Sequence, residues 1–296
     1  MPLVSTAELV TDAQAARSAV AAFNVITLEH AEAIAAGAER AGRPAILQLS
    51  ENAVKFHGNR LAPIAAATTA VARSSTARLA LHLDHVTEVD LLRAAHPEGI
   101  GSVMFDASKL SYAENVKATA DAVRWGHERG IWVEAELGKV GGKEGEPPLD
   151  AHAPGVRTDP REAAAYTAAT GVDALAVAVG SAHAMTERTA ALDHALITEL
   201  RDAVPVPLVL HGSSGVPDTE IRRAVAAGMV KINVGTALNT AFTGAARAFL
   251  EAHPSTVDPR KYLAPAREAM TGTVAHFLGL LGPLGLPESG ATSSPC

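Results

Sequence analysis

Short apolar runs alternate along the chain with longer segments in which apolar and polar residues recur at a helical period. The short runs are apolar at consecutive positions, as in parallel strands that are buried on both faces. The predicted strands are Ala21–Val25, Ala45–Leu49, Leu79–Leu83, Ser102–Asp106, Ile131–Glu136, Ala174–Val179, Leu208–Leu210 and Val230–Val234. Alanine-rich amphipathic segments between them predict helices, among them Glu29–Ala41, Ala113–Arg129, Asp159–Ala169 and Asp218–Ala227.

Eight strands that alternate with helices favour a single α/β domain, a (β/α)8 TIM barrel over residues 1–285. An open doubly wound sheet is the alternative, because periodicity does not report whether a sheet closes. The glycine-rich segment Gly138–Val156 predicts a long βα loop, and residues 253–270 predict a helical excursion after the eighth unit. The tail, residues 286–296, is rich in Ser, Gly and Pro, and we expect it to be disordered.

Composition and charge narrow the class of protein. The net charge of -7 argues against a nucleic-acid partner, because phosphate backbones attract basic surfaces. No apolar stretch reaches the roughly 18 residues of a membrane span, and the N-terminal residues lack the pattern of a signal peptide. The only cysteine is Cys296, which excludes an intrachain disulfide. These features predict a cytoplasmic protein without membrane or nucleic-acid partners.

Three histidines follow three predicted strands. His85, His183 and His211 each lie where an apolar run ends, and the carboxyl ends of barrel strands meet at one face. A single histidine in an apolar segment is more often a packed core residue, but three at strand ends predict a metal site with three protein ligands. His82 lies inside its strand, and we expect it to be structural and to point away from the neighbours of Asp84.

Carboxylates lie beside these histidines. Asp84 precedes His85, so it either supports the metal site or acts as an acid–base group; a helix-capping role is the alternative. Glu134 and Glu136 share one face of a strand, and Asp106 ends the strand before it. Because buried carboxylates need a cation or donors, these three predict a second metal position, a basic network or a salt-bridged inner layer.

Glycine and hydroxyl residues follow the last two strands. Gly212-Ser213-Ser214-Gly215 follows the seventh strand and Asn233-Val234-Gly235-Thr236 follows the eighth. Barrels frequently bind phosphate at these two places, through backbone N–H groups and helix N-termini. The pattern therefore predicts a metal-dependent barrel enzyme that acts on a phosphorylated small molecule.

With these motifs together, the chain resembles the class II, metal-dependent ketose-bisphosphate aldolases, which cleave fructose 1,6-bisphosphate or tagatose 1,6-bisphosphate. The resemblance extends over nearly the whole chain and keeps the order of the motifs. The matching segments are Ala22-Phe23-Asn24, Leu83-Asp84-His85, Val103–Ser108, Val133–Gly138, Gly141-Gly142-Lys143-Glu144, Gly180–His183, Leu210–Gly215, Lys231–Thr236 and Asp258-Pro259-Arg260.

The resemblance implies roles for the candidate residues. His85, His183 and His211 match the ligands of a Zn²⁺ or another divalent ion, which polarises the ketose carbonyl. Asp84 matches the group that exchanges a proton with the C4 hydroxyl, and Glu144 matches the acid–base group at C3 of the triose. The other matched positions are Glu136 and Asp106 near an alternative metal position; Gly212, Ser214, Asn233 and Thr236 for the C1 phosphate, often with Na⁺ or K⁺; Asn24 and Ser50 as substrate contacts; Arg260 for the far phosphate; and Asp258 near the C4 hydroxyl.

The implied reaction is reversible retro-aldol cleavage of fructose 1,6-bisphosphate, a glycolytic substrate, to dihydroxyacetone phosphate and glyceraldehyde 3-phosphate. Tagatose 1,6-bisphosphate or another ketose phosphate is the alternative substrate. The implied partners are a small-molecule sugar phosphate and further copies of the chain, as a homodimer or homotetramer.

Three departures from the family pattern and three rival functions accompany this interpretation. Ala184 replaces a glycine that usually follows the second histidine, and its backbone can serve provided that φ is negative there. Ala237 replaces a usual acid, and Gly145 follows the loop glutamate where an aspartate is common. The rivals are a Schiff-base aldolase that uses Lys231, a non-catalytic barrel that binds sugar phosphates, and a metal-dependent hydrolase.

Overall fold

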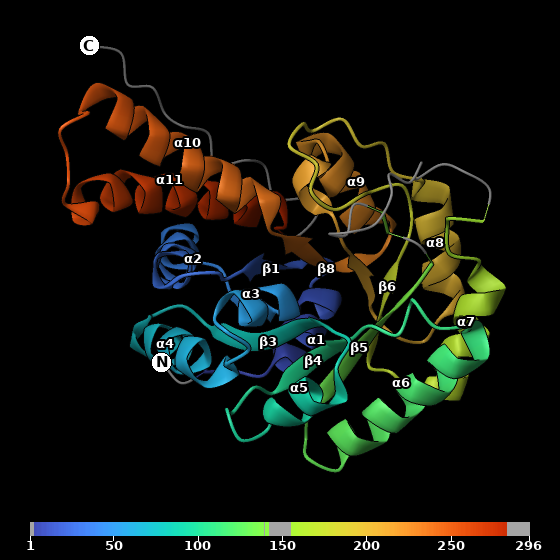
Figure 1. Ribbon diagram of the computed structural model, residues 1–296. Coiled ribbons are helices and arrows are strands. Elements are labelled where there is room, and N and C mark those ends of the chain that lie inside the picture. The colour runs from blue at the N-terminus through green and yellow to red at the C-terminus, as the bar shows by residue number, and fades with distance from the viewer. Residues whose placement is uncertain (1–2, 139, 142–154, 283–296) are drawn as a thin grey trace.

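Eight parallel strands close into a barrel in the order of the sequence, from β1 to β8 (Figure 1). The computed structural model describes residues 3–138, 140–141 and 155–282. Closure comes from β8, whose Lys231 pairs with Val20 of β1, so the open-sheet alternative is wrong. The strands are β1 (Val20–Asn24), β2 (Ala45–Ser50), β3 (Leu79–Val86), β4 (Ser102–Phe105), β5 (Trp132–Leu137), β6 (Ala174–Val177), β7 (Leu208–Leu210) and β8 (Met229–Val234).

Helices cover the outside of the barrel. Asp159 caps the predicted helix of residues 159–169, because its side chain accepts the backbone N–H groups of Arg161 and Glu162 and Pro160 is the first helical residue. The tail, residues 286–296, and most of the predicted loop Gly138–Val156 lie outside the described residues. The helices are α1 (Thr6–Ala15), α2 (Leu28–Ala41), α3 (Glu51–Phe56), α4 (Leu61–Ser74), α5 (Val89–Ala94), α6 (Tyr112–His127), α7 (Pro160–Thr170), α8 (His194–Ala203), α9 (Asp218–Ala227), α10 (Thr236–Ala252) and α11 (Pro259–Leu280), with a 3-10 turn at Ser213–Gly215.

Helix α1 covers the end of the barrel where the strands begin. Its buried Leu9 and Val10 pack in one apolar cluster with Ala22, Ile46 and Val230 of the strands. Burial of this apolar surface closes the barrel at that end. The carboxyl ends of the strands are left as the end at which ligands can enter.

The helix of the eighth unit, α10, projects from the barrel as an arm together with α11 (Figure 1). Helix α11 begins inside the predicted excursion, residues 253–270, and extends beyond it to Leu280. Helix α11 packs against α2, where a Cβ on Gly37 would lie 2.5 Å from Val274 Cγ1. Only glycine permits this close approach, and an ion pair between Arg40 and Glu268, at 2.8 Å, adds to the contact. The barrel therefore holds the arm through α11.

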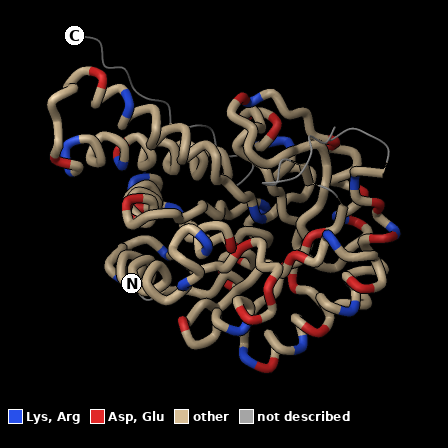
Figure 2. The backbone as a smooth tube through the Cα atoms, viewed as in Figure 1, with Lys and Arg blue, Asp and Glu red and all other residues tan. Residues whose placement is uncertain are grey.

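Charged side chains are spread over the outer helices, whereas most of α10 is uncharged (Figure 2). Helix α6 carries Glu114, Lys117, Asp121 and Arg124, the pattern of a helix with one face in water. Within the described ranges, no helix has the length and apolar character that crossing a membrane requires.

Candidate active site and metal centre

Three imidazole rings meet at the open end of the barrel. The ring centroids of His85 and His211 are 4.8 Å apart, those of His85 and His183 are 5.1 Å apart, and those of His183 and His211 are 5.7 Å apart. One ligand atom from each ring and one carboxylate oxygen of Glu136 all lie within 4.8 Å of one another. Imidazole nitrogens with a carboxylate are donors that fit Zn²⁺ and similar divalent ions. The predicted convergence of the three histidines is confirmed.

A local break in β3 turns Asp84 and His85 to the same cavity. The pairing of β3 with β4 shifts register between Leu83 and Val86, and His85 has a φ of 51°. This left-handed backbone interrupts the alternation of side chains, so two consecutive residues both line the cavity. Few non-glycine residues adopt this conformation, and such residues are found preferentially at functional sites.

His82 occupies the interior face that Asp84 shares, so the expectation that it points away from the neighbours of Asp84 is wrong. Its Nε2 lies 3.8 Å from Asp84 Oδ1, and its Nδ1 lies 2.9 Å from Ser102 Oγ. Burial, with the charge of Lys231 beside it, lowers the pKa of His82 to about 3. His82 is therefore neutral, and its bond to Ser102 agrees with a structural role.

Carboxylates hold two of the histidine rings. His85 Nδ1 lies 3.1 Å from Asp106 Oδ2, so Asp106 orients this ring and lies outside the group of donor atoms. His211 Nδ1 lies 2.9 Å from Glu136, and its Nε2 lies 3.0 Å from Glu134. Burial alone would lower the pKa of His211, but the two carboxylates raise it to about 9. A metal at this site would displace a proton from His211.

Glu134 and Lys231 form a fully buried ion pair behind His211. Lys231 Nζ lies 2.8 Å from Glu134 Oε2 and donates to Asn233 Oδ1, also at 2.8 Å. Burial alone would raise the pKa of Glu134, but Lys231 and His211 lower it well below its usual value. The predicted basic network around the buried carboxylates is present. Lys231 is fully buried and does not line the cavity, which argues against its use as a Schiff-base amine.

Asp84 is a buried carboxylate whose neighbours favour its charged form. Burial alone would raise its pKa, but the neighbouring His85, His211 and Lys231 lower it, so the carboxylate is ionised. Among the described residues, its buried Oδ1 has no hydrogen-bond partner. A buried acceptor without a donor is costly. This oxygen faces His82 Nε2, at 3.8 Å, inside the barrel.

The cavity has a volume of about 570 Å³ and is bordered by β1–β4 on one side and by β6–β8 on the other. Gly212 has a φ of 68°, and a Cβ there would lie 2.5 Å from the carbonyl oxygen of Ala182, so only glycine fits. Ser214 Oγ accepts the N–H of Ala237 at the start of α10, at 3.0 Å. The predicted substrate-side residues in the lining are Asn24, Ser50, Gly212, Ser214, Asn233 and Thr236.

Ala184 follows His183 and has a φ of 57°, so the condition of a negative φ at this position is not met. An alanine in the left-handed region costs roughly 1–2 kcal/mol. Ala184 lines the cavity. Backbone strain is therefore present beside one candidate ligand, His183, and at another, His85.

Two predicted residues lie apart from the cavity. Asp258 caps the start of α11 and forms an ion pair with Arg260 at 2.8 Å, and the Arg260 side chain is 89% exposed. Neither residue lines the cavity. Within one chain, the structure does not bring them to the histidines. Glu144 lies outside the described residues.

Several lining residues were not predicted. Gln48 donates to Asn24 Oδ1 at 2.5 Å, and Lys55 pairs with Glu51 at 2.7 Å on α3. Lys55 and Lys109 are the lysines in the lining. Two features of the sequence could have predicted these residues. Gln48 and Ser50 are two apart in one strand and so share a face, and Glu51 and Lys55 are four apart, the spacing of an ion pair on a helix.

The sequence matches the family described as fructose-bisphosphate aldolase class-II over residues 4–285. The YdjI aldolase from Escherichia coli K12 is 30% identical, with a TM-score of 0.80, and the match covers 96% of this chain and 98% of that one. A protein from Coccidioides immitis assigned as a fructose-1,6-bisphosphate aldolase is 27% identical, with a TM-score of 0.79 and coverage of 93% and 95%.

The fructose-bisphosphate aldolase from Campylobacter jejuni is 22% identical, with a TM-score of 0.78 and coverage of 95% of each chain, and shares the fold. The family match extends over nearly the whole barrel and includes each strand that carries a candidate ligand. The enzymes of this family are aldolases that depend on a divalent metal. The chain belongs to the class II fructose-bisphosphate aldolase family.

Proposed function

We propose that this chain catalyses the reversible retro-aldol cleavage of a ketose 1,6-bisphosphate, with fructose 1,6-bisphosphate as the first candidate. The products are dihydroxyacetone phosphate and glyceraldehyde 3-phosphate. The observation that carries the proposal is the convergence of three histidines beside Asp84 in one cavity. Tagatose 1,6-bisphosphate, or another ketose phosphate, is the alternative substrate.

The metal ligands are His85, His183 and His211, and Glu136 provides a further donor. Asp106 and Glu134 hold two of these rings, as carboxylates commonly do behind metal-binding histidines. A bound divalent ion, which we propose is Zn²⁺, would act as a Lewis acid on the ketose carbonyl.

Two carboxylates of the chain move the protons. Asp84 takes the proton of the C4 hydroxyl, the C4 oxygen becomes the aldehyde carbonyl, and the C3–C4 bond breaks with its electron pair left on C3. Glu144, as the general acid, then gives a proton to C3. The low pKa of Asp84 keeps it ionised in the free enzyme, ready to accept.

The C1 phosphate is proposed to bind where β7 and β8 end. Gly212 lets the backbone approach an anion, and Ser214 and Thr236 provide hydroxyl groups. Lys231 Nζ donates a hydrogen bond to Asn233 Oδ1, so the amide nitrogen of Asn233 is the group that can donate to substrate. A Na⁺ or K⁺ ion held by backbone carbonyls is part of the proposal.

The far phosphate needs a cation on the opposite side of the cavity. Lys55 and Lys109 lie there, after β2 and β4, and flank the strand that carries Asp84. Glu51 holds Lys55 at 2.7 Å and itself accepts the N–H of Thr87 at 2.7 Å. We therefore assign the far phosphate to this side. Arg260 could reach a cavity only from a second copy of the chain.

A coupled assay of triose-phosphate release tests the function. Purified chain is offered fructose and tagatose 1,6-bisphosphates, with and without a chelator and with Zn²⁺ restored. Release that stops with the chelator and returns with Zn²⁺ is the expected result, and the faster sugar identifies the substrate. Binding of both metal and sugar phosphate without release would favour the non-catalytic barrel. This assay does not test the proposed cytoplasmic location or the proposed homo-oligomer.

A further inference from the structure

A row of buried polar side chains lies inside the barrel beneath Asp84. It begins at Thr6 of α1, whose Oγ1 lies 2.6 Å from Ser102 Oγ, and Ser102 Oγ lies 2.9 Å from His82 Nδ1. All three residues are buried. On the other side of the His82 ring, Nε2 lies 3.8 Å from Asp84 Oδ1. The row therefore connects α1, at the closed end of the barrel, with the carboxylate at the open end.

Two buried atoms face each other at the upper end of this row. Among the described residues, neither His82 Nε2 nor Asp84 Oδ1 has a hydrogen-bond partner, although buried polar atoms in proteins are paired as a rule. Their separation is longer than a hydrogen bond. In a low-dielectric interior, however, a dipole and a charge at this separation still interact appreciably. The sign of that interaction depends on which ring nitrogen carries a proton.

The neutral ring of His82 carries one proton, on either Nδ1 or Nε2. A proton on Nδ1 would set the lone pair of Nε2 against the ionised Asp84, whereas a proton on Nε2 gives that carboxylate a donor. Ser102 permits the second form, because its hydroxyl can donate to Nδ1 while its oxygen accepts from Thr6. The other acceptor near this hydroxyl, the carbonyl oxygen of Leu81, is farther away at 3.1 Å.

We propose that His82, with its proton on Nε2, is a positioning residue for Asp84. The Nε2–H group directs Oδ1 toward the barrel interior and leaves Oδ2 to face the cavity, which Asp84 lines. Ser102 and Thr6 fix the ring in this form from the other side, as supporting hydrogen bonds do for a catalytic side chain. His82 keeps its proton and does not touch substrate. The inference rests on the proposed function, in which Asp84 accepts the C4 proton.

Nuclear magnetic resonance tests the position of the proton without any substrate. Two-bond ¹H–¹⁵N correlations in the Zn²⁺-loaded chain with ¹⁵N-labelled histidine report which ring nitrogen is protonated, and the signals missing from His82→Gln identify His82. We expect the form with the proton on Nε2. A proton on Nδ1, or on both nitrogens, would overturn the inference even in a chain that releases triose phosphate.

Two amide variants of His82 separate positioning from a merely structural role. The amide nitrogen of glutamine lies at about the same distance from the backbone as Nε2, whereas that of asparagine reaches only as far as Nδ1. In His82→Asn we expect kcat to fall about tenfold, with KM and bound Zn²⁺ unchanged. His82→Gln should recover most of this loss. Urea unfolding measures stability, and an equal loss of kcat in the two variants would overturn the inference.

A double-mutant cycle tests whether His82 acts through Asp84. In an Asp84→Asn background the carboxylate charge is absent, so His82→Asn should lower the residual kcat by less than about twofold. Losses that simply multiply would show that His82 does not act through this carboxylate. If the native chain cleaves no ketose phosphate, the proposed function fails, and the resonance measurement alone then decides where the His82 proton lies.

Discussion

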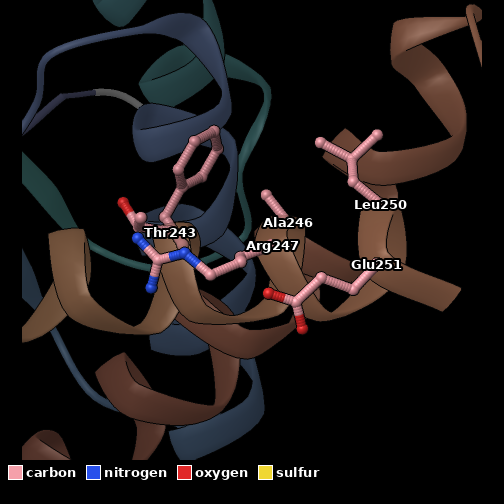
Figure 3. Close-up of a pocket in the computed structure, with 6 residues that line it drawn as sticks. Thr243, Ala246, Arg247, Leu250 and Glu251 are labelled. Carbon is pink, nitrogen blue, oxygen red and sulfur yellow. The ribbon is translucent and has the colours of Figure 1, made fainter. Parts of the chain in front are cut away.

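The open end of the barrel and the arm differ in how their charged side chains are paired. At the barrel end, buried charges are matched within one chain, as in the ion pair of Glu134 and Lys231. On α10, Arg247 and Glu251 form no ion pair with another described residue, and Leu250 is 38% exposed (Figure 3). Substitutions at the open end should therefore change the site, whereas substitutions on the arm should leave it unchanged.

Loss of a metal ligand should give the largest effect. In His85→Ala the donor set loses one of its three imidazoles, and we expect bound Zn²⁺ and turnover to fall together to background. Metal content by atomic emission and the coupled assay provide the measurements. His253→Ala removes an exposed histidine on the arm side and should change neither. A His85→Ala protein with bound metal and full turnover would contradict the assigned site.

Asp84→Asn should lower turnover by about 10²–10⁴-fold while metal and phosphate still bind. The amide keeps the size of the side chain but cannot accept the C4 proton. Asp121→Asn, at an exposed carboxylate on α6, is the control and should cost far less. If both variants slow the reaction equally, Asp84 is not the proton acceptor.

Lys231→Met should destabilise the fold by about 3–5 kcal/mol, because it leaves Glu134 as a buried charge without its partner. Urea unfolding measures this change. Lys261→Met, at an exposed position, should shift the free energy of unfolding by no more than about 0.5 kcal/mol. Trapping of a substrate adduct on Lys231 by borohydride in the native chain would instead support a Schiff-base enzyme.

Lys55→Met should raise KM for the bisphosphate by about tenfold, or about 1.4 kcal/mol, and leave KM for the matching ketose 1-phosphate unchanged. Only the bisphosphate has a far phosphate for this lysine to bind. Lys117→Met on α6 is the control for loss of one positive charge. Equal changes for both substrates would place the far phosphate elsewhere.

Ala184→Gly should give the smallest effect, a gain of about 1 kcal/mol or less in the free energy of unfolding. Glycine removes a left-handed strain of roughly 1–2 kcal/mol but adds about 0.4–1 kcal/mol of entropy to the unfolded chain. Thermal unfolding of the two proteins checks this. Ala203→Gly at the end of α8, where the residue does not have a positive φ, should instead lower the free energy of unfolding.

Much of the site follows from local pattern. Apolar runs ending in His183 and His211 predict strand ends, and barrel topology brings those ends together whatever the helices do. The predicted direction of the His82 side chain was wrong. His82 and Asp84 are two residues apart in one strand, and residues two apart lie on the same face. The bulge at His85 and the left-handed Ala184 depend on long-range packing, and no residue type in the sequence signals either.

The arm shows a second kind of feature that could not be predicted from the sequence, a contact between distant segments. The pattern predicts helix after the eighth unit, but the contact of α11 with α2 depends on Gly37, more than two hundred residues away from Val274. Arg260 matched a family motif, yet the motif does not specify which cavity the side chain reaches. Lys55 lacked a motif and was found only because the cavity brings it to the site.

The break in β3 has a consequence for how this site can change. Asp84 and His85 are neighbours in sequence, and consecutive Cα atoms are about 3.8 Å apart across a trans peptide. The proposed proton acceptor and the proposed metal ligand are thus joined by one peptide unit, and no loop movement or domain rotation can separate their Cα atoms. New substrates can therefore be accommodated through the surrounding walls, while the backbone positions of these two residues stay together.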